Sequence, residues 1–337
     1  MSTTSLSSQM LPAIEADLQQ VVRSSNEPGL DGFHHMMAYH MGWEGEGSGS
    51  VAAGKRIRPL LVLLVNASAG GEWRTALPAA AAVELVHNFS LIHDDIEDDS
   101  PLRRGRPTVW KKWGIPLAIN IGDAMLTLAH LSLLRLEGIS GCEIALKAEQ
   151  NLHQTCLDLT RGQHLDISYA DRRDMQLDAY WPMVTGKTGA LLSACAVLGA
   201  LVAGANKEIL TAYEEFGGNL GIAFQALDDL LGVWGDAALT GKSTDSDLVS
   251  GKKSLPILYG LSLDGEFAAR WLKGRVLPEE VNHLAQMLEA EGARDYTKET
   301  ATCFTDKALQ ALERAKPAGQ AGEELAFLAN QLLQRHL

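Results

Sequence analysis

The stretch Leu91–Thr108, LIHDDIEDDSPLRRGRPT, constrains this chain more than any other. An apolar segment, Ala79–Asp98, leads into it with the periodicity of a helix. On one helix Asp94, Asp95 and Asp98 share a face, because residues three and four apart are neighbours. Like charges at these spacings repel, and each disfavours ionisation of the next. A bound divalent cation removes that cost.

The ligand types in this cluster indicate which cation fits. All are carboxylate oxygens, with no cysteine nearby and no histidine at a paired spacing, which favours a hard ion, Mg2+. Arg103 and Arg104 follow, and their forked guanidinium groups match phosphate oxygens. The alternative is an acidic helix end that a basic loop neutralises on a solvated surface. The stretch by itself leaves both interpretations open.

The rest of the chain predicts an all-α fold. Of 337 residues, 46% are hydrophobic and 6% aromatic, and abundant Ala and Leu with little β-branched alternation favour helices. Helices are expected over Leu11–Val22, Ala79–Asp98, Leu117–Leu136, Glu143–Tyr169, Glu208–Trp234 and Leu255–Leu261, with more in Pro278–Leu337. No strand pairing or fixed-period repeat is evident. We expect one domain over residues 1–337, with a mobile Gly/Ser-rich loop at 42–54.

Charge and cysteine content exclude several classes of protein. A net charge of −13 argues against general binding of nucleic acid or anionic membranes. Four scattered cysteines predict reduced thiols and a cytoplasmic protein, and MSTTSLSSQM has no secretion signal. The most apolar run, Gly189–Ala205, is shorter than the ~20 residues of a membrane span, so we expect a buried helix and no integral membrane segment.

A second acidic cluster lies far along the chain, in Phe224-Gln-Ala-Leu-Asp-Asp229. Gln225 shares a helix face with Asp228 and Asp229 within an otherwise apolar segment. Polar residues on a core-facing stripe are hard to explain structurally. Lys187 begins the buried helix and needs an anionic partner there.

Two further features have both a functional and a structural interpretation. His87 and Ser90 lie along the helix face that leads to Asp94, although a lone histidine on a helix is usually structural. The basic run Lys55-Arg56-Ile57-Arg58 fits a second anion site, or an ordinary basic helix start.

Taken in order, the motifs GKRIRP, LIHDDIEDDSPLRRGRPT, Lys187-Thr188, FQALDD and GK…DL…GKKSLP resemble those of trans-isoprenyl diphosphate synthases, the polyprenyl synthetase family. The resemblance runs from Gly54 to Leu261. It implies an all-α bundle around a deep central cavity, usually a homodimer. It also implies head-to-tail condensation of an allylic diphosphate with isopentenyl diphosphate.

The resemblance assigns roles residue by residue. Asp94, Asp95 and Asp98 match the first aspartate-rich motif and Asp228 and Asp229 the second, which together hold three Mg2+ on the allylic diphosphate. Arg103, Lys187, Lys242 and Lys252 match positions that contact that diphosphate, with Gln225 and Thr188 nearby. Lys55, Arg58, His87 and Arg104 match positions that bind isopentenyl diphosphate. No side chain is assigned as a base, because in the family the released diphosphate is thought to take the proton.

The chain departs from the family pattern at three positions. Gly232 stands where many relatives have a third aspartate, and Asp236 is the next carboxylate, so we expect Asp228 to make most of the metal contact. Ala53 replaces a glycine, which is a mild change. Trp110 stands where a histidine is common, with no predicted effect.

The position of one aromatic residue bears on product length. Phe89 lies five residues before the first aspartate, and the small Ser90 follows it. This arrangement resembles one class of geranylgeranyl diphosphate synthases. We therefore expect geranylgeranyl diphosphate as the main product, with farnesyl diphosphate as the alternative.

Two other functions remain open. A class I terpene cyclase also ionises a diphosphate, but it lacks the second anion site that Lys55, Arg58 and Arg104 would form. A non-catalytic partner subunit is supported only by Gly232. A plain helical scaffold does not explain polar clusters on core-facing stripes.

Overall fold

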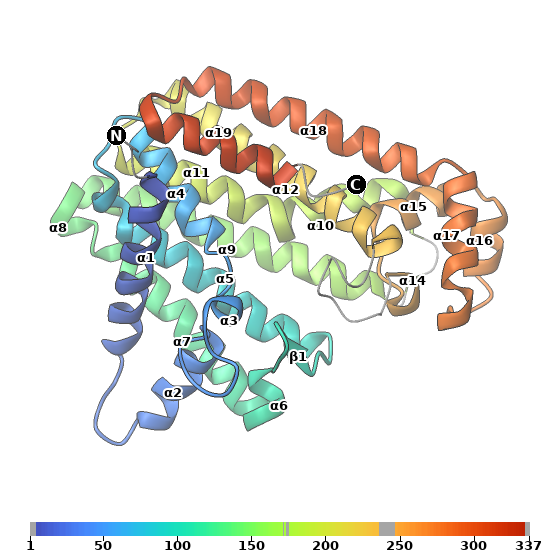
Figure 1. Ribbon diagram of the computed structural model, residues 1–337, viewed down its shortest axis with the longest axis horizontal. Helices are drawn as coiled ribbons and strands as arrows, with labels where there is room; N and C mark the ends of the chain where they lie inside the picture. Colours follow the sequence, from blue (N-terminus) through green and yellow to red (C-terminus); the bar gives the residue numbers. More distant parts are fainter. Residues whose placement is uncertain (1–4, 171, 173–174, 236–246, 334–337) are drawn as a thin grey trace. The chain divides into compact units, whose positions relative to one another are not determined.

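The computed structural model describes residues 5–170, 172, 175–235 and 247–333 (Figure 1). The α-helices are α1 (Leu6–Arg23), α2 (Asp31–His40), α3 (Ser50–Ala53), α4 (Ile57–Ser68), α5 (Leu77–Glu97), α6 (Val109–Trp113), α7 (Ile115–Leu134), α8 (Glu137–Ser140), α9 (Cys142–Ala170), α10 (Tyr180–Val184), α11 (Ala190–Val202), α12 (Lys207–Trp234), α14 (Asp247–Ser250), α15 (Leu255–Ser262), α16 (Glu266–Trp271), α17 (Val281–Ala290), α18 (Ala293–Ala315) and α19 (Gly319–Leu333). Short 3-10 turns are η1 (Trp73–Ala76), η2 (Leu177–Ala179) and η4 (Pro278–Glu280), and η3 (Thr185–Gly189) is a π turn. The strands β1 (Leu102–Arg103) and β2 (Arg106–Pro107) complete the described part, and the all-α prediction is confirmed.

The chain forms two compact units. The first unit comprises Met1–Cys156, Ala194–Glu214 and Arg314–Ala326, and the second comprises Leu157–Ser193, Glu215–Glu313 and Phe327–Leu337. Helices α9, α11, α12, α18 and α19 have residues in both units. The expectation of a single domain over residues 1–337 stays a prediction.

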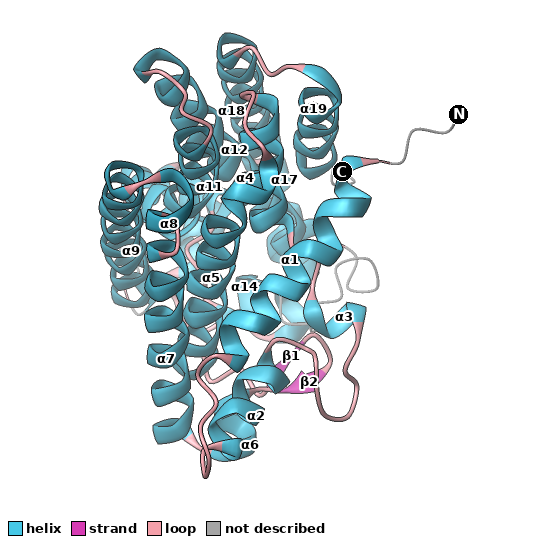
Figure 2. Cartoon of the chain, turned by 90° about the vertical axis from the view of Figure 1, so that its left-hand side faces the viewer, coloured by secondary structure: helices cyan, strands magenta, loops and turns pink. Residues whose placement is uncertain are grey.

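In the first unit, α5 is apolar around its whole circumference near its start and becomes polar at its end. The side chains from Pro78 to Val86 are all buried, as expected of a helix enclosed by others. Helix α5 packs against α7 and α4, and Figure 2 shows α5 and α7 side by side. Because the core encloses its first half, α5 presents its acidic residues only in its last turn.

Two predictions about loops were incomplete. No strand pairing was expected, yet β1 and β2 form a short antiparallel hairpin, drawn in magenta in Figure 2. Its turn places Arg104 and Gly105 at φ 51° and 76°, the left-handed pair of a type I′ turn.

The segment 42–54 was expected to be irregular, yet it ends in α3. Arg106 holds it in place by donating hydrogen bonds to the carbonyls of Glu44 and Glu46. Its mobility stays a prediction.

In the second unit, α12 packs among α10, α15 and α16 around a large apolar core. Tyr180 and Phe267 are among its fully buried side chains. The turn η3 continues α10 into α11, and there Gly186 touches Gly162 of α9 backbone to backbone. A side chain at either glycine would overlap the other helix, so this crossing requires both.

Three helical stretches are long and apolar enough to cross a membrane by length and composition alone: Trp73–Glu97, Ile115–Ser140 and Leu177–Val202. In the first and third, 67% and 72% of the most apolar window is buried within the structure, so core packing accounts for their composition. In Ile115–Ser140 the buried share is 44%, because α7 has one exposed apolar face. The absence of a membrane segment stays a prediction.

Candidate functional site

The first acidic cluster lies at the C-terminal end of α5. The helix ends at Glu97 and Asp98 is its C-cap, so the predicted helix is confirmed. Negative charge is unfavourable there, because the helix dipole is negative at its C-terminus. Asp95 is also buried, with 1% of its surface exposed, whereas Asp98 is exposed. Burial and helix dipole both add to the cost of the cluster, which favours a functional interpretation.

One oxygen of Asp95 is paired and the other is not. Arg103 holds Oδ1 with both Nε and Nη2 at 2.8 Å. Oδ2 is buried and has no hydrogen-bond partner in the described part of the chain. Burial raises the pKa of Asp95, and Arg103 opposes this rise. An unpartnered buried carboxylate oxygen beside further carboxylates fits a hard divalent cation.

Cationic groups gather in the same unit. Arg58 Nη1 lies 3.2 Å from Nε2 of His87, and since arginine can only donate, Nε2 accepts and the ring is neutral. Burial, and then Arg58 and Arg104, lower the pKa of His87 well below its usual value. The Nε of Arg58 is buried without a partner among the described residues. This excess of buried donors fits an anion such as a diphosphate.

The backbone holds Arg104 in place. It adopts the left-handed conformation, and its Nη1 donates to the carbonyls of Ala52 and Ala53 at 2.8 and 2.9 Å. Gly54, beside this guanidinium, has φ 83°, a conformation in which any other residue would be strained. Lys55 is exposed and lines a separate surface hollow of about 730 Å³.

Arg56 has a structural function that the sequence did not reveal. It is buried, and its guanidinium bonds Glu84 at 2.8 Å and Glu15 at 3.0 Å. The two carboxylates neutralise Arg56 and fix the start of α4. Of the two arginines in this run, Arg58 is therefore the better candidate for an anion.

The second acidic cluster contains two different aspartates. Asp229 is 1% exposed, and its Oδ2 accepts from the Tyr180 hydroxyl and the Leu255 backbone N–H, both at 2.9 Å. Its Oδ1 accepts from Gln225 at 2.8 Å, and Gln225 accepts in turn from Thr188 at 2.9 Å. Burial raises the pKa of Asp229 to about 6. Both oxygens are thus engaged within the protein.

Two lysines lie near this cluster, and with Thr188, Gln225 and Asp229 they line a small pocket of about 30 Å³. Lys187, on the π turn, pairs with Asp166, which confirms the expected anionic partner. Burial alone would lower the pKa of Lys252, but Asp247, Asp229 and other carboxylates raise it above its usual value. Single π turns occur often at functional sites.

The sequence analysis assigned no role to Asp247, although it belongs to the quoted GK…DL…GKK motif. A Cβ built on Gly232 would lie 2.6 Å from Asp247 Cγ and 2.9 Å from its Oδ1. The Asp247 carboxylate therefore occupies the space beside α12 where a side chain at position 232 would begin. Asp247, from α14, therefore places a carboxylate next to the position where many relatives have their third aspartate.

An aspartate at position 232, as in many relatives, should therefore reduce both the activity and the stability of this chain. We expect Gly232→Asp to lower kcat by at least about tenfold and to lower the melting temperature, because overpacking costs about 1–3 kcal/mol and places two carboxylates together. Steady-state kinetics and thermal unfolding of the variant measure both. Combining it with Asp247→Gly should recover part of the stability, and a gain in activity by Gly232→Asp alone would contradict this account.

The predicted residues that the structure describes divide between the two units. The first unit holds Lys55, Arg58, His87, Asp94, Asp95, Asp98, Arg103 and Arg104. The second holds Lys187, Thr188, Gln225, Asp228, Asp229 and Lys252. That both groups face one cavity stays a prediction, and Lys242 and Asp236 lie outside the described residues.

The two proposed chain-length residues lie on α5 next to the first group. The Phe89 ring packs edge-on against His93, with centroids 4.7 Å apart. Ser90 donates to the backbone carbonyl of His87 at 2.8 Å. Phe89 is only partly buried.

The chain is similar to known proteins over most of its length. The sequence profile of the family described as "Polyprenyl synthetase" matches residues 48–290. The chain is 36% identical to a geranylgeranyl diphosphate synthase of Mycobacterium tuberculosis, over 97% of this chain and 93% of that protein. It is 38% identical to a (2E,6E)-farnesyl diphosphate synthase of the same species, over 89% and 85%. The crystal structure of a polyprenyl synthetase from Streptomyces coelicolor A3(2) has a TM-score of 0.86 and 34% identity, covering 97% of this chain and 98% of that one.

Proposed function

This chain belongs to the polyprenyl synthetase family and is a short-chain prenyltransferase, and on that premise we propose that its main product is geranylgeranyl diphosphate. The proposed reaction joins isopentenyl diphosphate to an allylic diphosphate. The observation that carries it is the pairing, within the first unit, of a carboxylate cluster around Asp95 with two cations, the half-buried Arg58, whose Nε is buried without a partner among the described residues, and the exposed Arg104. One group suits a metal-bound diphosphate and the other suits a second diphosphate without metal.

Enzymes of this family use divalent metal ions, and the unpartnered Oδ2 of Asp95 fits one. We propose Mg2+, three ions by resemblance to the family, held by Asp94, Asp95 and Asp98 on α5 and by Asp228 on α12. When bound, Mg2+ stabilises charge on the leaving diphosphate. Asp229 is proposed to support Asp228, because its own oxygens already accept three hydrogen bonds.

Arginine, lysine and histidine side chains of the protein are proposed to stabilise the remaining negative charge of the two diphosphates. Breaking the allylic carbon–oxygen bond places charge on the diphosphate, and preorganised donors stabilise that charge best where water is excluded. Arg103, Lys187 and Lys252 are proposed to contact this diphosphate. Arg58, His87 and Arg104, with Lys55, are proposed to bind isopentenyl diphosphate and so to overcome the repulsion between two polyanions. No side chain is assigned as the base.

Product analysis tests the proposal. The purified chain with Mg2+, isopentenyl diphosphate and either dimethylallyl, geranyl or farnesyl diphosphate should consume isopentenyl diphosphate and yield geranylgeranyl diphosphate on chromatography. A cyclase would ignore isopentenyl diphosphate. Complete inactivity of the folded protein would favour the alternative that this chain is a non-catalytic partner subunit. Farnesyl diphosphate as the end product would mean that the product is one isoprene unit shorter than we propose.

Phe89 is proposed to limit chain growth. We expect Phe89→Ala to shift the products toward chains longer than geranylgeranyl, because it removes a partly buried ring one turn below the acidic cluster. The ratio of product lengths, measured at equal substrate conversion, gives the result. Phe89→Leu, which keeps most of the volume, serves as the control. An unchanged profile in Phe89→Ala would remove this residue from the control of length.

We further propose that the chain acts as a cytoplasmic homodimer. Helix α7 exposes apolar side chains along one face, among them Ile115, Ile119, Leu131 and Leu134 at 43–55% exposure. Such a face favours association with another protein surface. Sedimentation equilibrium should give twice the mass of one chain, and Leu131→Glu should shift the protein toward monomer. A wild-type monomer at micromolar concentration would overturn the assignment.

A further inference from the structure

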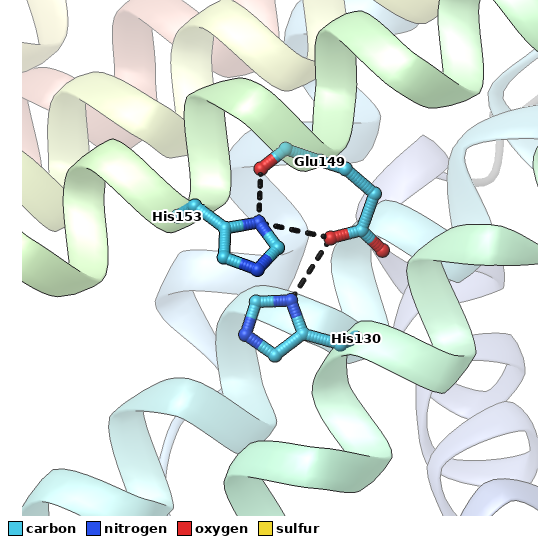
Figure 3. Close-up of side chains that lie close together, drawn as sticks. All are labelled: His130, Glu149 and His153. Carbon is cyan, nitrogen blue, oxygen red and sulfur yellow. Dashed lines mark hydrogen bonds and ion pairs between the residues drawn. The ribbon is translucent and has the colours of Figure 1, made fainter.

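A separate group of metal-ligand side chains lies in the first unit, away from both aspartate motifs in the sequence. His130 comes from α7, and Glu149 and His153 come from successive turns of α9 (Figure 3). One donor atom from each lies within 4.8 Å of the other two. None of the motifs that carry the proposed function contains these residues, so the group needs its own explanation.

The donor atoms already have the spacing of a coordination site. Glu149 Oε2 lies 2.9 Å from Nδ1 of His130 and 3.4 Å from Nδ1 of His153. Zinc bonds of ~2.0–2.2 Å in a tetrahedron place neighbouring ligand atoms about 3.3 Å apart. The two imidazole rings stack with centroids 4.3 Å apart, and in Figure 3 both Nδ1 atoms face the same carboxylate. Two of the three donor distances thus approach those of a coordination site, and a rotation of the imidazole rings would direct both histidines at one ion.

Burial and exposure suit an ion that enters from solvent. Glu149 is 8% exposed, and its Oε1 is buried without a hydrogen-bond partner among the described residues. A buried carboxylate oxygen that lacks a partner is costly, and a cation held by the carboxylate relieves that cost. The side chain of His153 is 66% exposed, which leaves the group open on one side. Without metal, Nδ1 of His153 bonds the Glu149 carbonyl at 2.8 Å, a contact that an ion would replace.

We propose that His130, Glu149 and His153 bind one Zn2+, with water in the remaining position. Two imidazoles and one carboxylate favour zinc over Mg2+, which prefers ligands made only of oxygen. The site is thus chemically distinct from the aspartate motifs. It does not rest on the proposed reaction. Because its ligands come from two helices, the ion ties α7 to α9 next to the exposed apolar face of α7.

Zinc binding to the full-length, metal-free chain tests the proposal. The titration is run with Zn2+ in millimolar Mg2+, so that the aspartate motifs hold Mg2+. The wild type should bind one Zn2+ tightly per chain, and its melting temperature should rise with Zn2+ concentration. Glu149→Gln and His153→Ala should each weaken binding by at least about tenfold and abolish the rise, since even loss of an outer partner costs that much. His164→Ala, an exposed histidine on the same helix, should behave as wild type.

A spectroscopic readout identifies the ligands. Co2+ in the wild type should give the visible absorption of a tetrahedral site, and His153→Ala should lose it. Because the His153 ring is exposed, this variant should fold even if Glu149→Gln does not. Equal Zn2+ affinity in wild type and His153→Ala, or no binding at 100-fold excess of Zn2+ over protein, would mean that the three side chains are only a hydrogen-bonded group.

Discussion

Asp94→Asn should lower kcat by about 100- to 1,000-fold, the loss typical of removing one preorganised electrostatic group from a reaction that develops charge. The substitution keeps the size of the side chain and removes the charge. Asp94 is only partly buried in the last turn of α5, where its negative charge opposes the helix dipole. The folded state should therefore be as stable as wild type or more so. Steady-state kinetics at saturating Mg2+ and thermal unfolding measure the two effects.

Asp99→Asn is the matched control for Asp94→Asn. Asp99 belongs to the same acidic run, is exposed and has φ 49°, a conformation that asparagine adopts as readily. We expect its kcat to stay within about twofold of wild type, as for a surface substitution away from the site. If both variants lost activity equally, the total charge of the run would matter and not the position of Asp94. If neither did, the metal assignment would be wrong.

Gly162→Ala should lower the free energy of unfolding by about 1–3 kcal/mol, although alanine is the better helix former. The added Cβ would lie 2.6 Å from the Gly186 carbonyl carbon and 2.9 Å from Lys187 Cα, both backbone atoms that cannot turn away. The π turn must then move away from α9, and Lys187 moves with it away from Asp166. Activity should fall as well, which urea unfolding and kinetics measure separately.

Gly218→Ala provides the contrast. Gly218 lies within α12 in the same unit, and a Cβ there would meet nothing within 4 Å. This variant should gain about 0.5–1 kcal/mol, because alanine loses less backbone entropy than glycine in a helix. If Gly162→Ala were as stable as Gly218→Ala, the two helices would have room to separate and the close crossing would not be required.

The sequence predicted what depends on local pattern. Helix α5 and its acidic end follow from periodicity and the spacing of Asp94, Asp95 and Asp98, and the structure agrees. The hairpin β1–β2 was missed because two-residue strands are too short for alternation and because Arg104-Gly105 is not a usual turn pair.

Other features depend on contacts between residues distant in sequence. Arg56 and Arg58 look alike in the motif, and only the packing of Glu15 and Glu84 separates their roles. Asp247 approaches Gly232 although the two are distant in sequence, and no local pattern specifies that contact. The shared cavity predicted for the two aspartate motifs is a property of long-range assembly and stays a prediction.

The hydrogen bonds of Asp229 have a consequence for engineering this family member. One carboxylate joins the first amide of α15, the phenol of α10 and the amide side chain of Gln225, so three helices share a single anchor. Even asparagine at position 229 would give up an acceptor and disturb all three helices together.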